Sequence, residues 1–252
     1  DIVERATKDS KTLAGVLVKD FNLRGTTTDS WLPFEVINNE TTFDISEISN
    51  TYAISGTDLS STTDLTCATL LIVKHGKKYV LQQYFMPSEV IDKRVHEDKV
   101  PYDIWVTQGW VTVCEGSRVN YSDITNWYNK MRDEHQIYAL WNGYDRWGAQ
   151  YWVEEMTQHG YQMESVIQGA ITMSQPMKEL EADLREGKVI YNNNPVLKWC
   201  FTNTQIKGDE NDNIRPVKGR NSKQRIDGVV SLIDAYVILH KRFEDYMNMV
   251  KE

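Results

Sequence analysis

Three aspartates lie at positions where a carboxylate is either costly or well placed for chemistry. Asp58 lies within or at the end of an expected buried strand, where a carboxylate needs a neutralising partner. Asp145 follows the apolar stretch 137–141, so it is expected at the C-terminal tip of a strand, where open α/β sheets bind ligands. Asp227 lies near the start of the last expected helix, beside Gly228, which would allow a close approach to the sheet. The three carboxylates could therefore meet at one point.

Converging aspartates would hold a hard cation, because oxygen-only ligation selects Mg²⁺ or Mn²⁺. Two such ions, about 3.5–4 Å apart, suit phosphodiester hydrolysis, since they activate a water and stabilise the leaving oxygen. The sequence contains no motif for zinc binding, nucleotide binding or a catalytic serine nucleophile. The five histidines and three cysteines form no HExxH or CxxC pattern, which argues against zinc. Without GxxxxGK[ST], GxGxxG or GxSxG, the chain is not expected to hydrolyse ATP by itself.

Each acid also has a structural interpretation. Asp145 could be the N-cap of a helix that begins near residue 147, and Asp227 could be a first-turn acid favoured by the helix dipole. Asp64, in a Ser/Thr-rich turn, is of a type more common in turns than among metal ligands. Asp234 follows Asp227 on the same helix face but about 10 Å further along the axis. It is therefore expected to form a salt bridge rather than to share a metal shell.

The elements that must position these acids follow from the hydrophobic pattern. Three antiparallel strands are expected first, and strands then alternate with helices, which predicts an α/β fold with a mixed sheet flanked by helices. The expected strands are 52–58, 66–74, 79–85, 137–141 and 163–167, and the expected helices are 120–135, 147–159, 175–186, 195–203 and 222 onward. A polar loop is expected before the last helix, whose apolar stripe runs from Ile226 to Phe243.

Composition limits the class of protein. The chain of 252 residues has no apolar run of about 18 residues, so no membrane partner is expected. Its 36 acids and 28 bases leave a net charge of −8, which excludes a uniformly basic surface. The scattered Cys67, Cys114 and Cys200 favour packed thiols in a reducing compartment. Because the chain starts without methionine, it is expected to be a piece of a longer protein, with the polar residues 1–50 as a strap on a neighbouring domain.

Several segments resemble one protein family. The sequence GTDLSSTTDLT at 56–66 resembles the motif that opens the nuclease domain of the large terminase subunit of tailed double-stranded DNA phages. The segments that follow in family order are GWVTV at 109–113, YDRW at 144–147, QG at 168–169, SQPMKELE at 174–181, NPVLKW at 194–199 and KQRIDG at 223–228. The chain departs from the family pattern at Cys114 and Glu115, where Thr-Pro is expected, and at Asp234, where the family has an apolar or small residue.

The resemblance implies an RNase H-like fold and a two-metal endonuclease that cuts concatemeric phage DNA in the host cytoplasm during phage assembly. Residues 1–50 would be a linker from a packaging ATPase domain outside this chain, and 51–252 the nuclease domain. The family motif assigns catalysis and metal ligation to Asp58, Asp145 and Asp227, with Asp64 as an additional ligand. The portal protein and the small terminase subunit would be partners of the full-length motor.

Double-stranded DNA is the expected substrate, and one local segment could hold its phosphates. Residues 214–225 contain five bases and no acid directly before Asp227. These bases are Arg215, Lys218, Arg220, Lys223 and Arg225. Arg146 could clamp a phosphate or pair with the aspartates. A solvated basic loop is the structural interpretation of the segment. The alternative functions are an RNase H-like resolvase or transposase, and a non-cleaving module that grips DNA or docks within the motor.

Overall fold

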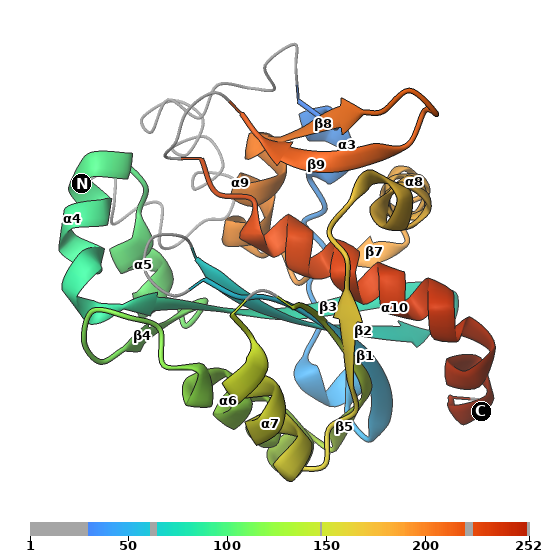
Figure 1. Cartoon of the computed structure of the whole chain (residues 1–252), viewed down its shortest axis with the longest axis horizontal. Coiled ribbons are helices and arrows are strands. Elements are labelled where there is room, and N and C mark those ends of the chain that lie inside the picture. Colours follow the sequence, from blue (N-terminus) through green and yellow to red (C-terminus); the bar gives the residue numbers. More distant parts are fainter. Residues whose placement is uncertain (1–29, 61–64, 147, 220–223, 251–252) are drawn as a thin grey trace.

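The computed structural model describes residues 30–60, 65–146, 148–219 and 224–250. In this part of the chain, a seven-stranded mixed sheet has the order β4-β3-β2-β1-β5-β6, and β7 pairs with β3 (Figure 1). Its strands are β1 (Thr51–Asp58), β2 (Thr66–Lys74), β3 (Lys77–Pro87), β4 (Val111–Cys114), β5 (Ile137–Asp145), β6 (Met163–Val166) and β7 (Val189–Ile190). The first three strands are antiparallel neighbours, which confirms the predicted start of the sheet, and the other strands join in parallel.

Helices cover both faces of this sheet (Figure 1). One face carries α6 (Tyr121–His135) and α7 (Gln150–Gln158). The opposite face carries α10 (Asp227–Met249), with α8 (Ala170–Arg185) and α9 (Pro195–Asn203) beside it. The remaining helical segments are α3 (Phe34–Ile37), η1 (Ile45–Ile48), α4 (Ser88–Asp98) and α5 (Tyr102–Thr107). The predicted mixed sheet flanked by helices is therefore confirmed.

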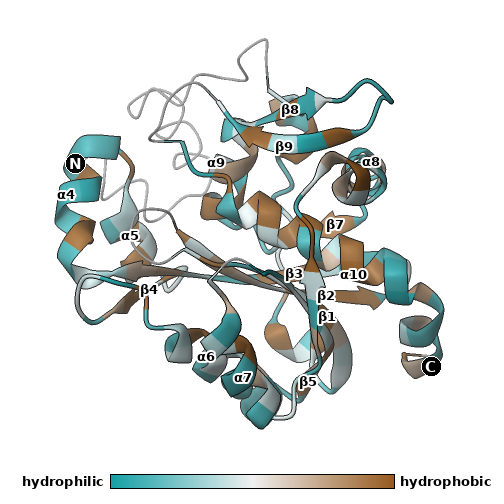
Figure 2. Cartoon of the chain, in the orientation of Figure 1, coloured by the Kyte–Doolittle hydropathy of each residue, from teal (hydrophilic) through white to brown (hydrophobic). Residues whose placement is uncertain are grey.

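Two hydrophobic cores form because successive side chains of a strand point to opposite faces. In β1, Ala53 belongs to the core under α6 and α7, whereas Ile54 belongs to the core under α10. Figure 2 shows hydrophilic residues on the outward sides of α6 and α7, as expected for helices with one buried side. By this alternation Gly56 and Asp58 lie on the same face as Ile54, towards α10.

A bulge in β5 brings the end of that strand to the same face. Ala53 pairs with Ala139, but the next residue, Ile54, pairs with Trp141, so Leu140 is an extra residue in β5. Before the bulge, Ala139 packs in the α6/α7 core, and after it Trp141 packs against the α10 core. A one-residue shift exchanges the two faces of a strand. The bulge therefore turns Gly143 and Asp145, which alternate with their neighbours after Trp141, towards α10.

The region before α10 differs from the prediction. The expected polar loop is a two-stranded hairpin, β8 (Thr204–Gly208) and β9 (Ile214–Lys218), separate from the main sheet. The last helix begins at Asp227 rather than near residue 222. It also has non-helical backbone angles at Arg242, and Phe243 is 52% exposed, so the apolar stripe ends before this residue. The backbone irregularity explains why Phe243 leaves the core despite its helical spacing.

Residues 30–50 pack along α8, β7 and α9. Leu32 is 1% exposed, and Trp31 donates a hydrogen bond from Nε1 to Glu181 at 3.2 Å. Asn39 Nδ2 donates to the carbonyl oxygen of Val189 at 2.8 Å. All three cysteines are buried free thiols, as predicted. Within the described ranges, no helix is long and apolar enough to cross a membrane.

Candidate active site

The three predicted site aspartates occupy the ends of elements that meet on one side of the sheet. Asp58 is the last residue of β1, Asp145 is the last residue of β5, and Asp227 is the first residue of α10. β1 and β5 are parallel neighbours in register at Thr57 and Tyr144, so one step further Asp58 and Asp145 end side by side. Helix α7 is preceded by an N-cap at residue 149, so Asp145 does not cap it.

Glycines in β1 and β5 allow α10 to lie directly on these strands. A Cβ at Gly56 would come within 2.2 Å of the Ser231 carbonyl oxygen and 2.4 Å of the Ala235 nitrogen, both backbone atoms. A Cβ at Gly143 would come within 3.1 Å of the Asp234 carbonyl oxygen. Each glycine lies two residues before a site aspartate. The absence of side chains there seats the helix against the strand ends that carry the acids.

Buried hydrogen bonds hold the first turns of α10 in place. Ser231 Oγ donates to the carbonyl oxygen of Gly56 at 2.9 Å and contacts Thr69 Oγ1 at 2.6 Å. Gln82 Nε2, from β3, donates to the carbonyl oxygen of Gly228 at 2.8 Å. These contacts connect the helix to β1, β2 and β3 beside its first residue. The position of Asp227, which is only 4% exposed, is therefore determined by three strands.

The acids act on one another electrostatically. Burial raises the pKa of Asp58 well above its ordinary value, and the charges of Asp227, Asp234 and Asp145 raise it further. A hydrogen bond from Gln168 acts in the opposite direction. Asp58 is thus the central member of a group of carboxylates that repel one another.

Asp234 is placed differently from its prediction. It is 0% exposed, and among the described residues it forms no salt bridge. Its Oδ2 accepts a hydrogen bond from Gln168 Nε2 at 3.0 Å. The expectation of a salt-bridging acid was wrong because α10 lies so close to the sheet that this turn of the helix is covered.

A cleft of about 400 Å³ opens beside the aspartates. Its lining combines the end of β1, the start of α10, the segment before α8 and strand β9, namely Asp58, Leu59, Ser60, Gln168, Met173, Arg215, Pro216, Val217, Lys218, Ile226, Asp227 and Val230. The hairpin thus contributes Arg215 and Lys218, two of the bases predicted to hold phosphate. Arg146 is exposed next to Asp145. The predicted site residues Asp64, Arg220 and Lys223 lie outside the described residues.

Arg225 is placed in the interior rather than on a DNA-facing surface. It is 3% exposed, and its Nη2 lies 3.7 Å from Asp98 Oδ2 of α4. Asn203 Nδ2 donates to its carbonyl oxygen at 3.0 Å. The guanidinium neutralises a buried carboxylate, so we leave Arg225 out of the proposed DNA contact. The run of bases could not reveal this difference because its acidic partner is more than a hundred residues away.

The donor chemistry of the site fits a hard divalent cation. The acidic side chains of the site are carboxylates, and Oδ1 of the buried Asp234 has no hydrogen-bond donor within the described residues. In the same ranges, no three His, Cys, Asp or Glu side chains are gathered closely enough to hold one ion together. Like charges repel one another, so ligation by several of these acids requires their side chains to turn inward.

Sequence reasoning missed two polar residues that hold the site together. Gln168 was noticed only as part of a family motif, and Ser231 was not noticed. Both are ordinary polar residues whose importance depends on what lies opposite them in the fold. A serine spaced four residues from Asp227 on the buried helix face is the one local signal for Ser231.

Comparison with known proteins identifies one family. A family model described as the terminase large subunit, endonuclease domain, matches residues 1–242. The large terminase subunit of Enterobacteria phage HK97 is 26% identical over 181 residues, covering 71% of this chain and 35% of that protein. Protein YmfN of Escherichia coli strain K12 is 29% identical over 167 residues, covering 62% and 35%. This chain therefore spans about a third of the length of these relatives.

Solved structures agree on the fold. The crystal structure of the HK97 bacteriophage large terminase matches with a TM-score of 0.73 and 22% identity, over 94% of this chain and 49% of that one. The large terminase nuclease from thermophilic phage G20c matches with a TM-score of 0.50 and 15% identity, over 74% and 82%. The predicted RNase H-like fold is thereby confirmed.

Proposed function

This chain belongs to the family of terminase large subunit endonuclease domains, and we propose that it is a metal-dependent endonuclease that cuts concatemeric double-stranded DNA during phage genome packaging. One observation carries the proposal. The aspartates that end β1, end β5 and begin α10 lie at element ends that meet on one face of the sheet, beside a cleft with basic residues in its wall. The acids could bind the divalent cations that phosphodiester hydrolysis uses, and the bases could contact the phosphates of the substrate.

The proposed roles follow from these positions. Asp58, Asp145 and Asp227 would hold two ions of Mg²⁺ or Mn²⁺, with Asp58 shared and the other two acids completing one side each. Asp64, outside the described residues, stays a proposed additional ligand. When bound, such ions supply an activated water and stabilise the leaving oxygen. The chain orients the carboxylates by fixing α10 on the strand ends.

DNA would enter over the hairpin side of the cleft. Arg215 and Lys218 of β9 line it, and the exposed Arg146 follows Asp145 directly. These side chains would contact phosphates, which gives affinity without reading sequence. Arg220 and Lys223, outside the described residues, keep their predicted role. We therefore propose cutting that tolerates many sequences.

The remaining proposals concern the longer protein. Residues 1–50 would connect to a packaging ATPase domain, and 51–252 would form the nuclease domain. Because the chain spans about a third of its relatives, the portal protein and the small terminase subunit are proposed partners of the whole motor. Host cytoplasm during phage assembly is the proposed location.

Digestion of a supercoiled plasmid tests the activity. The chain is incubated with Mg²⁺, with Mn²⁺ and with EDTA, and nicked and linear products are measured. We expect cutting with either ion and none with EDTA. Asp58→Asn should reduce cutting to background, because it removes the shared ligand. Asp92→Asn, which removes an exposed acid of α4, is the matched control and should cut normally.

Two outcomes would contradict the proposal. Full cutting by Asp58→Asn would overturn the metal-ligand assignment. Failure of the wild-type chain to cut with either ion would favour the non-cleaving module that grips DNA or docks within the motor. Joining of DNA ends, or a preference for branched junctions, would favour the resolvase or transposase alternative.

A further inference from the structure

Asp234 is a buried acid for which the proposed three-aspartate site has no role. It lies at the end of the second turn of α10 and is fully buried, at 0% exposure. Its Oδ2 accepts a hydrogen bond from Gln168, whereas its Oδ1 has no hydrogen-bond donor within the described residues. A buried carboxylate oxygen without a donor is costly, so such an atom calls for a partner of positive charge.

The position of Asp234 is determined by the two glycines under α10. A Cβ at Gly56 would come within 3.1 Å of the Asp234 carbonyl carbon, and a Cβ at Gly143 would come equally close to its carbonyl oxygen, at 3.1 Å. Asp58 and Asp145 follow these glycines by two residues and so project from the same face. Asp234 therefore lies over the pair of strands whose ends carry both acids.

Gln168 links Asp234 to the cleft. It lines the cleft together with Asp58 and Asp227, and its amide nitrogen lies 3.0 Å from Asp234 Oδ2. The same amide opposes the rise in pKa that burial causes in both Asp58 and Asp234. One amide with two N–H groups can serve two carboxylates. Gln168 is thus placed to hold Asp234 beside Asp58.

The acids that act on Asp58 form two groups, Asp227 on the one hand and Asp145 with Asp234 on the other. Asp227, at the start of α10, lies on the cleft side. Asp145 and Asp234 act on each other, since the charge of Asp145 adds to the effect of burial in raising the pKa of Asp234. Asp58, Asp145 and Asp227 carry three negative charges, whereas two divalent cations carry four positive charges. Asp64 or Asp234 would therefore each make the charges equal.

We propose that Asp234 is a further carboxylate of the metal site, on the side of Asp145, where it strengthens the binding of the second divalent ion, and that Gln168 positions it. This inference rests on the proposed metal-dependent function. It assigns a role to a residue at which the chain departs from its family pattern.

Titration with Mn²⁺ tests this inference without relying on cleavage. Binding is followed by calorimetry and by the loss of the free-ion signal in electron paramagnetic resonance. The wild-type chain is expected to bind two ions. Asp234→Asn should lower the affinity for the second ion at least tenfold and leave the affinity for the first ion unchanged. Asp245→Asn, an exposed acid on the same helix, is the matched control and should bind as the wild type does.

Gln168→Met separates positioning from ligation. The substitution keeps the size of the side chain but removes the amide donor. The affinity for the second ion should therefore fall by less than it does in Asp234→Asn. In plasmid digestion, both variants should need more Mn²⁺ for half-maximal cutting while approaching the wild-type rate at saturation. This variant also tests the inference if Asp234→Asn does not fold.

The possible failures are distinguishable. If the wild type binds two ions and both variants bind them with unchanged affinities, the role of Asp234 is overturned and the nuclease proposal stands. A wild type that binds only one ion also overturns it. If the wild type binds no Mn²⁺, the metal-dependent function itself fails.

Discussion

Arg225 and Asp227 lie two residues apart at the start of α10, yet they belong to buried charge clusters of opposite kinds. Arg225 pairs with Asp98, and a second guanidinium, Arg94, lies 3.7 Å from the same carboxylate, which also accepts a hydrogen bond from Tyr102. Asp227 faces Asp58 in a group of acids whose mutual repulsion raises the pKa of Asp58 beyond the effect of burial. One cluster pairs opposite charges, whereas the other brings like charges together.

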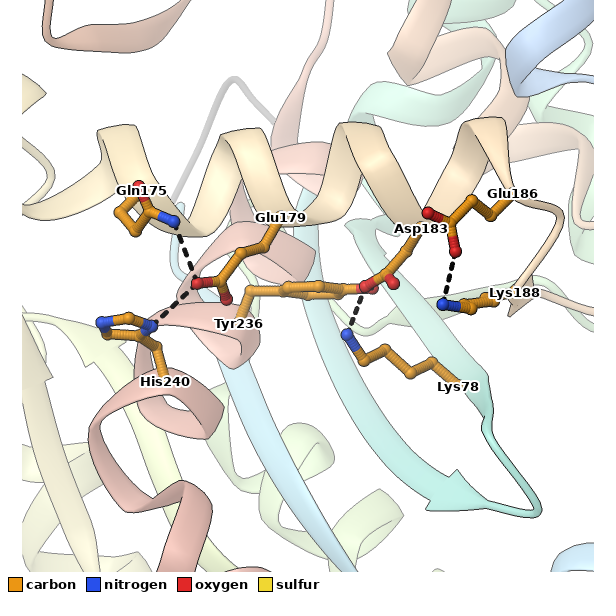
Figure 3. A network of polar contacts seen from close by, with 8 residues as sticks. All are labelled: Lys78, Gln175, Glu179, Asp183, Glu186, Lys188, Tyr236 and His240. Atoms are coloured by element: carbon orange, nitrogen blue, oxygen red, sulfur yellow. Dashed lines mark hydrogen bonds and ion pairs between the residues drawn. The ribbon is translucent and has the colours of Figure 1, made fainter.

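A third cluster, on the other side of α10, resembles the paired one. Figure 3 shows the Lys78 ammonium at the Asp183 carboxylate, with Tyr236 beside them. Tyr236 donates to Asp183 at 3.1 Å, and His240 Nδ1 lies 3.0 Å from Glu179. Here β3 is joined to α8 by an ion pair of opposite charges, Lys78 and Asp183.

The difference separates structural charges from functional ones. A buried ion pair that is complete gives little net stability but is costly to break, because one partner then remains buried without compensation. A buried cluster of one sign is costly as it stands, and proteins keep such clusters where an ion or a substrate supplies the missing charge. The two kinds of cluster therefore respond to substitution in opposite directions.

The largest expected effect is the breaking of the paired cluster. Asp98→Ala leaves the buried Arg225 without its carboxylate and should lower the free energy of unfolding by about 3 kcal/mol. Urea unfolding at neutral pH measures it. Glu97→Gln, which breaks the exposed pair with Lys93 on the same helix, should change stability by less than about 0.5 kcal/mol. Equal losses in both variants would contradict the distinction.

The next effect has the opposite sign. Asp58→Asn relieves repulsion among the site acids and should raise the free energy of unfolding of the metal-free protein by about 1 to 2 kcal/mol. Unfolding in EDTA measures this gain. Added Mn²⁺ should then stabilise the wild type more than the variant, because the variant has lost the shared ligand. A destabilised variant would show that the carboxylate is structural.

A third effect concerns a base that is held by amide oxygens. Lys198 Nζ donates to Asn38 Oδ1 at 2.7 Å and to Asn193 Oδ1 at 2.5 Å. Burial lowers the pKa of Lys198 from 10.5 to about 8, against the charge of Glu40. Between these values the unfolded chain binds more protons than the folded one, so the contribution of Lys198 to stability rises with pH.

Lys198→Met removes this titration. We subtract the free energy of unfolding of the wild type from that of the variant. This difference should be largest below pH 8 and should fall as pH increases towards 10.5. Chemical unfolding from pH 7 to 10.5 measures the difference. Lys207→Met, at an exposed position on β8, is the control for replacing a lysine by methionine. Two parallel profiles for Lys198→Met and the wild type would contradict the assignment.

Much of the fold was predictable from local pattern. Alternating apolar residues before Asp58 and the apolar stretch before Asp145 indicate strands that end in acids, and α10 shows helical spacing from Val229 to Ile233. The hairpin was not predictable in this way, because its Asn- and Asp-rich tip and Pro216 are typical of a loop. The kink at Arg242 also left no local signal.

The amino-acid sequence by itself determined which elements carry the candidate acids, since the period of a strand or helix depends on neighbouring residues alone. Only the tertiary structure decided which of those acids meet. The bulge at Leu140 turns Asp145 towards α10, and the glycines of β1 and β5 bury Asp234 beside it. Asp98 likewise removes Arg225 from the surface. These outcomes depend on contacts between residues far apart in the chain, which local periodicity does not contain.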